Sequence, residues 1–190
     1  MDYSRASREE LIAIIEMQER WHLAARFDPI AGVMNREGIL DRLQVEMSRT
    51  QREGRPLGVG LADISGFRHI GRRLGPRCVE TVLAAVAGRI GDVLRVYDRV
   101  GRVGGDEFLI LAPGVGAVDL RAMFQRVRAA VGREPVRCGD ERFPVDICIG
   151  SVVFRGGHSS ERLLSAVQGA LLRERNRENP QDDGPPENRE

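Results

Sequence analysis

Apolar residues recur along most of this chain at the spacings of amphipathic helices and buried strands. Spacings of three and four residues predict helices over 7–26, 35–51, 66–94, 118–131 and 159–173, with an interruption of the third at Gly75-Pro76. Runs of small and aliphatic residues predict strands over 56–64, 96–103 and 107–111, and two more within 136–154 around the turn at 138–141. The chain therefore alternates strands and helices behind a helical extension.

The order of these elements is strand, helix, strand, strand, helix, strand. That order is typical of the split βαβ pattern of ferredoxin-like, palm-type folds. It predicts an α+β domain with a central antiparallel sheet and a helical N-terminal extension.

The two ends of the chain differ from its middle. Ile14, Met17, Trp21 and Ala24 form one apolar stripe on the first helix. This stripe either packs on the domain or pairs with a second helix, because two heptads are marginal alone. Residues 174–190 carry no apolar side chain and are expected to be disordered. We expect an N-terminal helix and linker over 1–27, one folded domain over 28–175 and a disordered tail over 176–190.

Composition limits the partners and the compartment. The net charge is +1, so no strong field draws the chain to nucleic acid or to an anionic membrane. All 29 basic residues are arginine, so any phosphate clamp must be a guanidinium group. Cys78, Cys138 and Cys148 are odd in number and lack C-x-x-C spacing, which predicts buried thiols in a reducing compartment. No apolar run is long enough for a membrane span, and we expect a cytoplasmic protein.

The segment Gly104-Gly105-Asp106-Glu107-Phe108 carries the strongest chemical signal. Its two glycines lie between strand-like runs and allow the backbone to approach a bulky ligand closely. Asp63 ends the strand that this topology places beside the hairpin. Two acids and a backbone carbonyl form a plausible site for Mg²⁺ or Mn²⁺ beside a triphosphate. The alternatives are a plain hairpin with solvated acids and an Asp63 that caps the next helix.

This pentapeptide resembles the signature of the GGDEF family, the bacterial diguanylate cyclases. Residues 28–36 are similar to the family motif D-x-L-T-G-L-x-N-R, and residues 63–70 are similar to D-x-D-x-F-K-x-I. The resemblance covers about 28–175. It implies a homodimer that condenses two GTP molecules into cyclic di-GMP and releases two pyrophosphates.

The resemblance also implies roles for the matched residues. Asp63, the Ile64 carbonyl and Asp106 would hold the metal ion. Glu107 would activate the ribose 3′-hydroxyl or hold a second metal, so Asp63, Asp106 and Glu107 are the catalytic candidates. The substrate-binding positions would be Gly66, Phe67, Arg68 (in place of the family's lysine), Gly71, Glu80, Gly104, Gly105 and Arg175.

A second feature of the family lies before the two glycines. Arg95-Val96-Tyr97-Asp98 matches its R-x-x-D inhibitory site, and Arg126 falls where the family places a third member. Guanidinium groups stack on guanine and a carboxylate accepts from its edge, so Arg95, Asp98 and Arg126 would bind cyclic di-GMP. The alternative is a surface ion pair.

The departures from the family concern the substrate. Gly71 stands where an asparagine would read guanine, Glu80 replaces an aspartate, and Ser65 replaces the second acid of D-x-D. The last helix barely matches the family motif, and either Arg173 or Arg175 on it would supply the cation that binds the phosphates.

Because of these departures, an alternative to the cyclase is a degenerate domain that binds cyclic di-GMP or GTP. A sensor or effector protein would act through the N-terminal helix in either case. Another palm-type nucleotidyl transferase is a third option, but the chain lacks a polymerase's size and basic groove.

Overall fold

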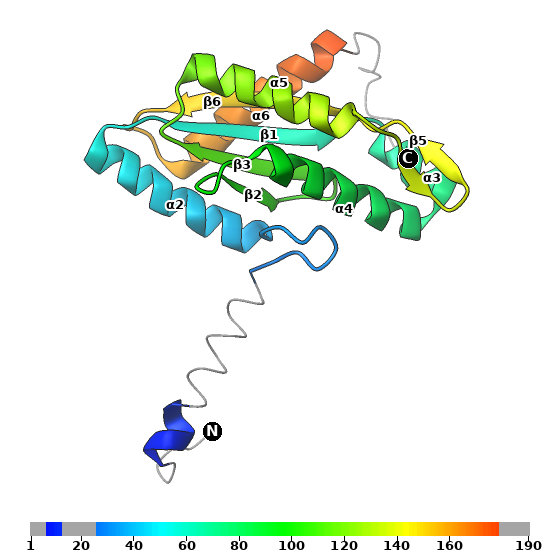
Figure 1. Cartoon of the computed structure of the whole chain (residues 1–190). Helices are drawn as coiled ribbons and strands as arrows, with labels where there is room; N and C mark the ends of the chain where they lie inside the picture. The colour runs from blue at the N-terminus through cyan, green and yellow to red at the C-terminus, as the bar shows by residue number, and fades with distance from the viewer. Residues whose placement is uncertain (1–6, 13–25, 179–190) are drawn as a thin grey trace, which may run out of the picture.

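The computed structural model describes residues 7–12 and 26–178, and it centres on a four-stranded antiparallel sheet (Figure 1). The strand order is β2-β3-β1-β6. The bounds are β1 (Leu57–Ile64), β2 (Arg99–Arg102), β3 (Glu107–Pro113) and β6 (Ile147–Phe154). A separate small hairpin pairs β4 (Val136–Cys138) with β5 (Glu141–Phe143). The predicted α+β fold with a central antiparallel sheet is confirmed.

Helices cover both faces of the sheet (Figure 1). On one face α2 (Arg36–Glu53) and α6 (Ser160–Glu178) pack against Leu57, Val59 and Leu61 of β1. On the other face α4 (Pro76–Val93) and α5 (Ala117–Gly132) pack against Ala62 and Ile64, while the short α3 (Phe67–Leu74) follows β1. Side chains alternate along a strand, so Asp63 falls on the face covered by α2 and α6.

Gly150 of β6 allows α6 to lie directly on the sheet. A Cβ atom at this position would stand 2.0 Å from the backbone nitrogen of Leu171 and 2.3 Å from its Cα. Any larger residue would push α6 away from the strand, because backbone atoms cannot yield as a flexible side chain does. This contact fixes the height of α6 above β6, and with it the place where the last turn of the helix ends.

Three expectations about elements are corrected by the structure. Residues 174–178, expected to be disordered, continue α6; their charged side chains take part in ion pairs rather than in apolar packing. Residues 136–154 form three strands instead of two. β2 begins at Arg99 rather than at 96, because the residues before it form a turn. The predicted first helix is helical over 8–12, and its apolar stripe lies outside the described residues, as does 179–190.

The expectation of three free thiols is wrong for two of the cysteines. A disulfide joins Cys78, in the first turn of α4, to Cys138 at the end of β4, and their Cα atoms are 5.4 Å apart. The two residues are 60 positions apart in the chain, so their spacing gave no indication that folding brings them together. Cys148 is free and buried. The cysteine count therefore no longer supports a reducing compartment.

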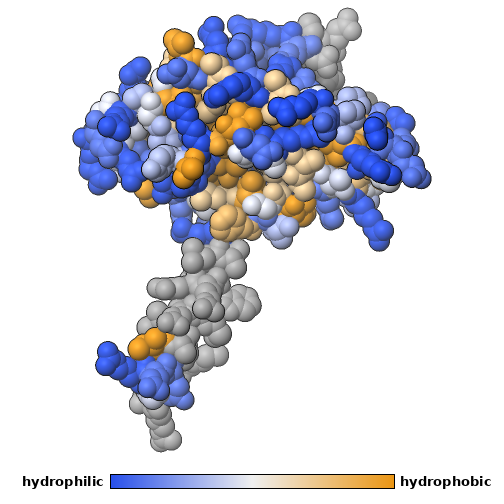
Figure 2. All heavy atoms as spheres, in the orientation of Figure 1, coloured by the Kyte–Doolittle hydropathy of each residue, from blue (hydrophilic) through white to orange (hydrophobic). Residues whose placement is uncertain are grey.

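The surface carries charges of both signs. Hydrophilic atoms cover most of the rim of the face drawn in Figure 2, and apolar residues gather towards its middle. Within the described ranges, no helix combines the length and the apolar character that crossing a membrane requires.

Candidate functional site

The turn between β2 and β3 lies at the carboxyl end of β1. β3 pairs with β1 so that Glu107 stands opposite Asp63, and the Ile64 N–H donates to the carbonyl of Asp106 at 3.3 Å. The structure thus brings together the four residues to which the sequence assigned the metal and the catalysis: Asp63, Ile64, Asp106 and Glu107.

Arg102 holds this turn in place. Its Nε donates to the carbonyls of Gly104 and Gly105, both at 3.1 Å, and its Nη2 donates to Gly105 at 2.7 Å. Its Nη1 pairs with Asp28 Oδ2 at 3.1 Å, and both side chains are largely buried. Arg36 adds a bond from its Nη1 to the carbonyl of Val103 at 2.8 Å. The turn is therefore fixed by guanidinium groups before any ligand binds.

The motif at 28–36 thus helps to fix the turn between β2 and β3, because Asp28 pairs with Arg102 and Arg36 donates to Val103. Burial alone would raise the pKa of the Asp28 carboxyl, but the N–H groups of Ala31 and Ile30 and the charge of Arg102 outweigh it and lower the pKa. Asn35 caps α2 by accepting from the Gly38 N–H. Sequence reasoning found the motif but missed the roles of Arg36 and Arg102, although both flank matched motifs.

Asp63 stands in a crowded negative environment. Its side chain is 5% exposed. Burial first, and then the charge of Asp106, raise the pKa of Asp63 to about 6, with a smaller contribution from Glu107. Arg175 opposes this shift, and its Nη2 lies 3.4 Å from Asp63 Oδ1. Of the two arginines considered for the phosphate cation, Arg175 is the one that reaches the acids; Arg173 lines a groove between α5 and α6.

The donor set fits a divalent cation that keeps much of its own hydration. Among the described residues, no group of three or more Asp, Glu, His or Cys side chains forms a complete metal site. Mg²⁺ is usually held by one or two carboxylates together with waters and substrate phosphates. The buried carboxylate of Asp63 beside the negative charge of Asp106 suits such an ion, because a cation relieves the repulsion between the two groups.

The loop after β1 presents backbone donors to the same place. Gly66 adopts φ +69°, a left-handed conformation that favours glycine, and α3 starts at the next residue. The first N–H groups of a helix have no partner within the helix, so those of Phe67 and Arg68 can meet an anion. The Ser65 N–H is already used, since it donates to the carbonyl of Asp146 at 3.0 Å.

The positions expected to read guanine lie on two successive helices, Gly71 on α3 and Glu80 on α4. Gly71 packs beside α4, where a Cβ atom would stand 3.5 Å from Val79 Cγ2, an ordinary contact. Glu80 follows Val79 and is exposed. The structure therefore places Gly71 beside Val79, the residue that precedes Glu80, and Gly71 has no side chain to contact a base.

The R-x-x-D segment forms a turn closed by its own acid. Asp98 is buried, and its Oδ2 accepts from the Arg95 N–H at 2.8 Å. Among the ion pairs of the described residues, none joins Arg95 to Asp98, so the alternative of a surface ion pair is not observed. Arg95 in this turn and Arg126 in α5 are exposed, and Val96 and Tyr97, which lie between Arg95 and Asp98, are 84% and 77% exposed. The turn presents cationic and apolar groups to solvent.

Comparison with known sequences agrees with these features. The family described as "Diguanylate cyclase, GGDEF domain" matches residues 25–181. Diguanylate cyclase DgcP of Pseudomonas aeruginosa is 31% identical over 146 residues, which are 77% of this chain and 22% of DgcP. Diguanylate cyclase DosC of Escherichia coli is 28% identical over 145 residues, which are 76% of this chain and 32% of DosC. The chain belongs to the GGDEF family, and it spans about a fifth to a third of the length of these relatives.

Solved structures show the same fold. Diguanylate cyclase SiaD of Pseudomonas aeruginosa, in complex with its activator SiaC, superposes with a TM-score of 0.78 at 31% identity, covering 90% of this chain and 69% of SiaD. The coiled coil and GGDEF domain of DgcB from Caulobacter crescentus, in complex with c-di-GMP, gives a TM-score of 0.82 at 19% identity, covering 88% of this chain and 90% of that one. At that identity DgcB bears on the fold alone.

Proposed function

We propose that this chain is a metal-dependent diguanylate cyclase, which joins two GTP molecules into cyclic di-GMP and releases two pyrophosphates. The observation that carries the proposal is the gathering of Asp63, Asp106 and Glu107 at the end of β1, opposite Arg175. Burial, and then the negative charge of Asp106, raise the pKa of Asp63 to about 6, so the carboxylates at this point lack a fully compensating positive charge. A divalent cation bound with a phosphate-bearing substrate would supply that charge.

Each group has a distinct task in this reaction. Asp63, Asp106 and the Ile64 carbonyl would hold Mg²⁺ or Mn²⁺, which would supply charge neutralisation at the phosphates and make a nearby hydroxyl easier to deprotonate. The backbone N–H groups of Phe67 and Arg68, with the guanidinium groups of Arg68 and Arg175, bind the phosphate oxygens. Glu107 lies over the turn, since a Cβ atom at Gly104 would stand 2.9 Å from its Oε2. From there its carboxylate accepts the proton of a 3′-hydroxyl.

Two chains are required because each active site holds one GTP. The 3′-hydroxyl oxygen of each nucleotide forms a bond to the α-phosphorus of the other, and the bond from that phosphorus to pyrophosphate breaks. Two such steps close the cyclic product. Facing domains in a homodimer supply the proximity that the reaction needs.

The base is held less firmly than the phosphates. With Gly71 in place of an asparagine, guanine loses hydrogen bonds, each worth about 1 kcal/mol. Glu80 still offers a carboxylate to the guanine edge. Affinity for GTP therefore depends mainly on the triphosphate.

The test is incubation with GTP and Mg²⁺ or Mn²⁺, followed by chromatography of the nucleotides. Asp106→Asn keeps the size of the side chain and the backbone bond to Ile64 but removes the charge, so we expect turnover to fall at least about a hundredfold. Asp92→Asn, at the exposed end of α4, is the matched control and should stay at the wild-type rate. An Asp106→Asn variant as fast as the wild type would refute the metal assignment.

A second candidate is a receptor for cyclic di-GMP, favoured by the missing side chain at Gly71 and the exposed Arg95 and Arg126. In that case the same experiment yields no product. Cyclic di-GMP then binds, and Arg95→Ala abolishes the binding. In the cyclase, the same three residues, Arg95, Asp98 and Arg126, serve product inhibition.

We also propose that a partner protein regulates the chain through its N-terminal segment, residues 1–27. The similarity to SiaD, whose structure was solved with its activator, supports this proposal. Nucleic acid is not expected as a partner, because the net charge is only +1.

A further inference from the structure

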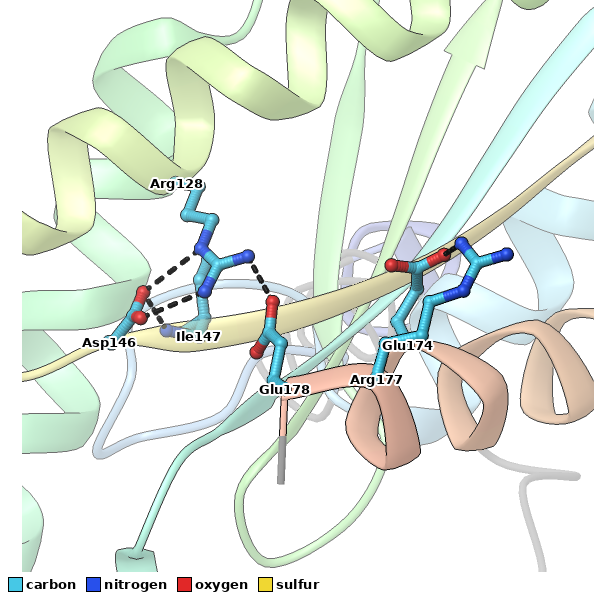
Figure 3. A network of polar contacts seen from close by, with 6 residues as sticks. All are labelled: Arg128, Asp146, Ile147, Glu174, Arg177 and Glu178. Carbon is cyan, nitrogen blue, oxygen red and sulfur yellow. Dashed lines mark hydrogen bonds and ion pairs between the residues drawn. The ribbon is translucent and has the colours of Figure 1, made fainter. Parts of the chain in front are cut away.

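Arg128 of α5 is the centre of a polar network that the sequence did not indicate (Figure 3). Its Nε and Nη2 donate to the two carboxylate oxygens of Asp146, at 3.3 and 3.0 Å. Its Nη1 pairs with Glu178 in the last turn of α6. One guanidinium group therefore links α5, the start of β6 and the end of α6.

The contact with Asp146 connects Arg128 to the loop between β1 and α3, which is proposed to bind the phosphates. Asp146 directly precedes β6, and its Oδ1 also accepts from the Ile147 N–H at 2.8 Å. Its backbone carbonyl accepts from the Ser65 N–H at 3.0 Å, and Ser65 precedes Gly66 in the loop between β1 and α3. Two bonds from Arg128 thus fix the residue on which this loop rests.

The contact with Glu178 bears on Arg175, the arginine that is proposed to bind the substrate phosphates. Arg175 lies three residues before Glu178, so both side chains project from the same side of the last turn. Arg175 meets Asp63 at 3.4 Å, while the ion pair of Arg177 with Glu174 stays within the helix (Figure 3). Leu171 is the last buried apolar residue of α6. Polar contacts, not burial, hold the turn that carries Arg175.

We propose that Arg128 is a positioning residue for the phosphate site: through Asp146 it holds the Ser65 loop, and through Glu178 it holds the turn from which Arg175 reaches the triphosphate. This inference rests on the proposed binding of GTP at Asp63 and Asp106. It explains how α6 delivers a cation although its sequence scarcely matches the family's motif there.

The test compares Arg128→Gln, which removes both contacts, with Glu178→Gln, which removes only the contact to α6. We expect Arg128→Gln to raise the KM and the dissociation constant of GTP with Mg²⁺ about tenfold with little change in kcat, because a phosphate contact binds substrate and transition state alike. Glu178→Gln should raise both about threefold, and have no further effect in an Arg175→Ala background, since contacts acting through one residue are not additive.

Hydrogen exchange supplies a readout that a general loss of stability would not move. In both variants the amides of 172–178 should exchange faster, while those of β1 and β3 keep their protection. Arg121→Gln, an exposed arginine on the same helix, is the matched control and should behave as the wild type. If Arg128→Gln fails to fold, Glu178→Gln at the exposed helix end still decides the question.

The outcomes separate this inference from the proposed function. A wild type that binds GTP without forming cyclic di-GMP refutes the cyclase, and the ratios of dissociation constants then test Arg128 alone. Variants that bind GTP as tightly as Arg121→Gln overturn the role of Arg128 even if the cyclase stands. Additive effects of Glu178→Gln and Arg175→Ala do the same, and a wild type that binds no GTP overturns both.

Discussion

At Asp63 the stability of the folded domain and the proposed binding of a cation favour opposite protonation states. Its carboxyl is buried beside Asp106, and its pKa is raised to about 6. The charged form that would bind a cation is therefore the form that the folded chain disfavours when no cation is present. Arg175 compensates only in part, because it is half-exposed and 3.4 Å away.

Asp63→Asn should stabilise the metal-free protein at neutral pH. The folded-state pKa lies above the ordinary value of 3.8, so the wild type takes up a proton on folding between about pH 4 and 6 and loses this advantage as the pH rises. The gap in unfolding free energy between Asp63→Asn and the wild type should widen with pH through this range by about 3 kcal/mol. Urea unfolding at several pH values measures it. A gap that does not change with pH would contradict the burial argument.

At the scale of elements, the β4–β5 hairpin is tied to α3 and α4, the helices that carry the proposed guanine-binding positions. The disulfide joins Cys138 to Cys78 at the start of α4. Arg73 at the end of α3 pairs with Glu141 at 3.3 Å, and its guanidinium lies 5.3 Å from the ring centre of Phe143. The exposed ion pair contributes little, so the disulfide is the main link.

Reduction of this disulfide should destabilise the domain. Closing a loop of 60 residues restricts the unfolded chain by an entropy worth about 4 kcal/mol in the chain-entropy account. When a dithiol reductant is added, the denaturation midpoint of the wild type should fall. It should reach the midpoint of a Cys78→Ser/Cys138→Ser double variant, which should not respond to the reductant. Cys148→Ala should keep the wild-type response. A double variant as stable as the oxidised wild type would contradict the expectation.

At the scale of the whole molecule, one chain contains half of the machinery that the proposed reaction needs. Each domain has one set of acids at one hairpin turn, whereas the product contains two nucleotides. The visible face is hydrophilic over most of its rim, and the net charge is close to zero (Figure 2). We expect the association of two such chains to depend on their concentration.

Cyclic di-GMP formed per chain should therefore rise with protein concentration at saturating GTP. At low concentration, most chains are monomers, and the total rate should grow with the square of the concentration before becoming linear. Initial rates over about a hundredfold range of dilution, with sedimentation on the same samples, test this. A constant rate per chain across the range, with only monomers present, would exclude the two-chain mechanism.

The sequence determined the elements and the central chemistry because both are encoded locally. Alternating and helical spacings placed the strands of the sheet, and their order fixed which strand ends meet. Asp63 at the end of one strand and Asp106 in the turn of the hairpin were therefore predicted to be neighbours, and the structure places them so. The family followed from the same short motifs.

Only the tertiary structure decided which distant side chains support that site. Arg102 meets Asp28 across 74 positions, Cys78 meets Cys138 across 60, and Arg128 meets Glu178 across 50. The choice of Arg175 over Arg173 depends on how α6 is rotated over β6. Residues 174–178, without apolar side chains, continue α6, where Arg175 and Glu178 pair with Asp63 and Arg128 on other elements. Such pairings arise from register and helix orientation, which the local pattern of residues does not encode.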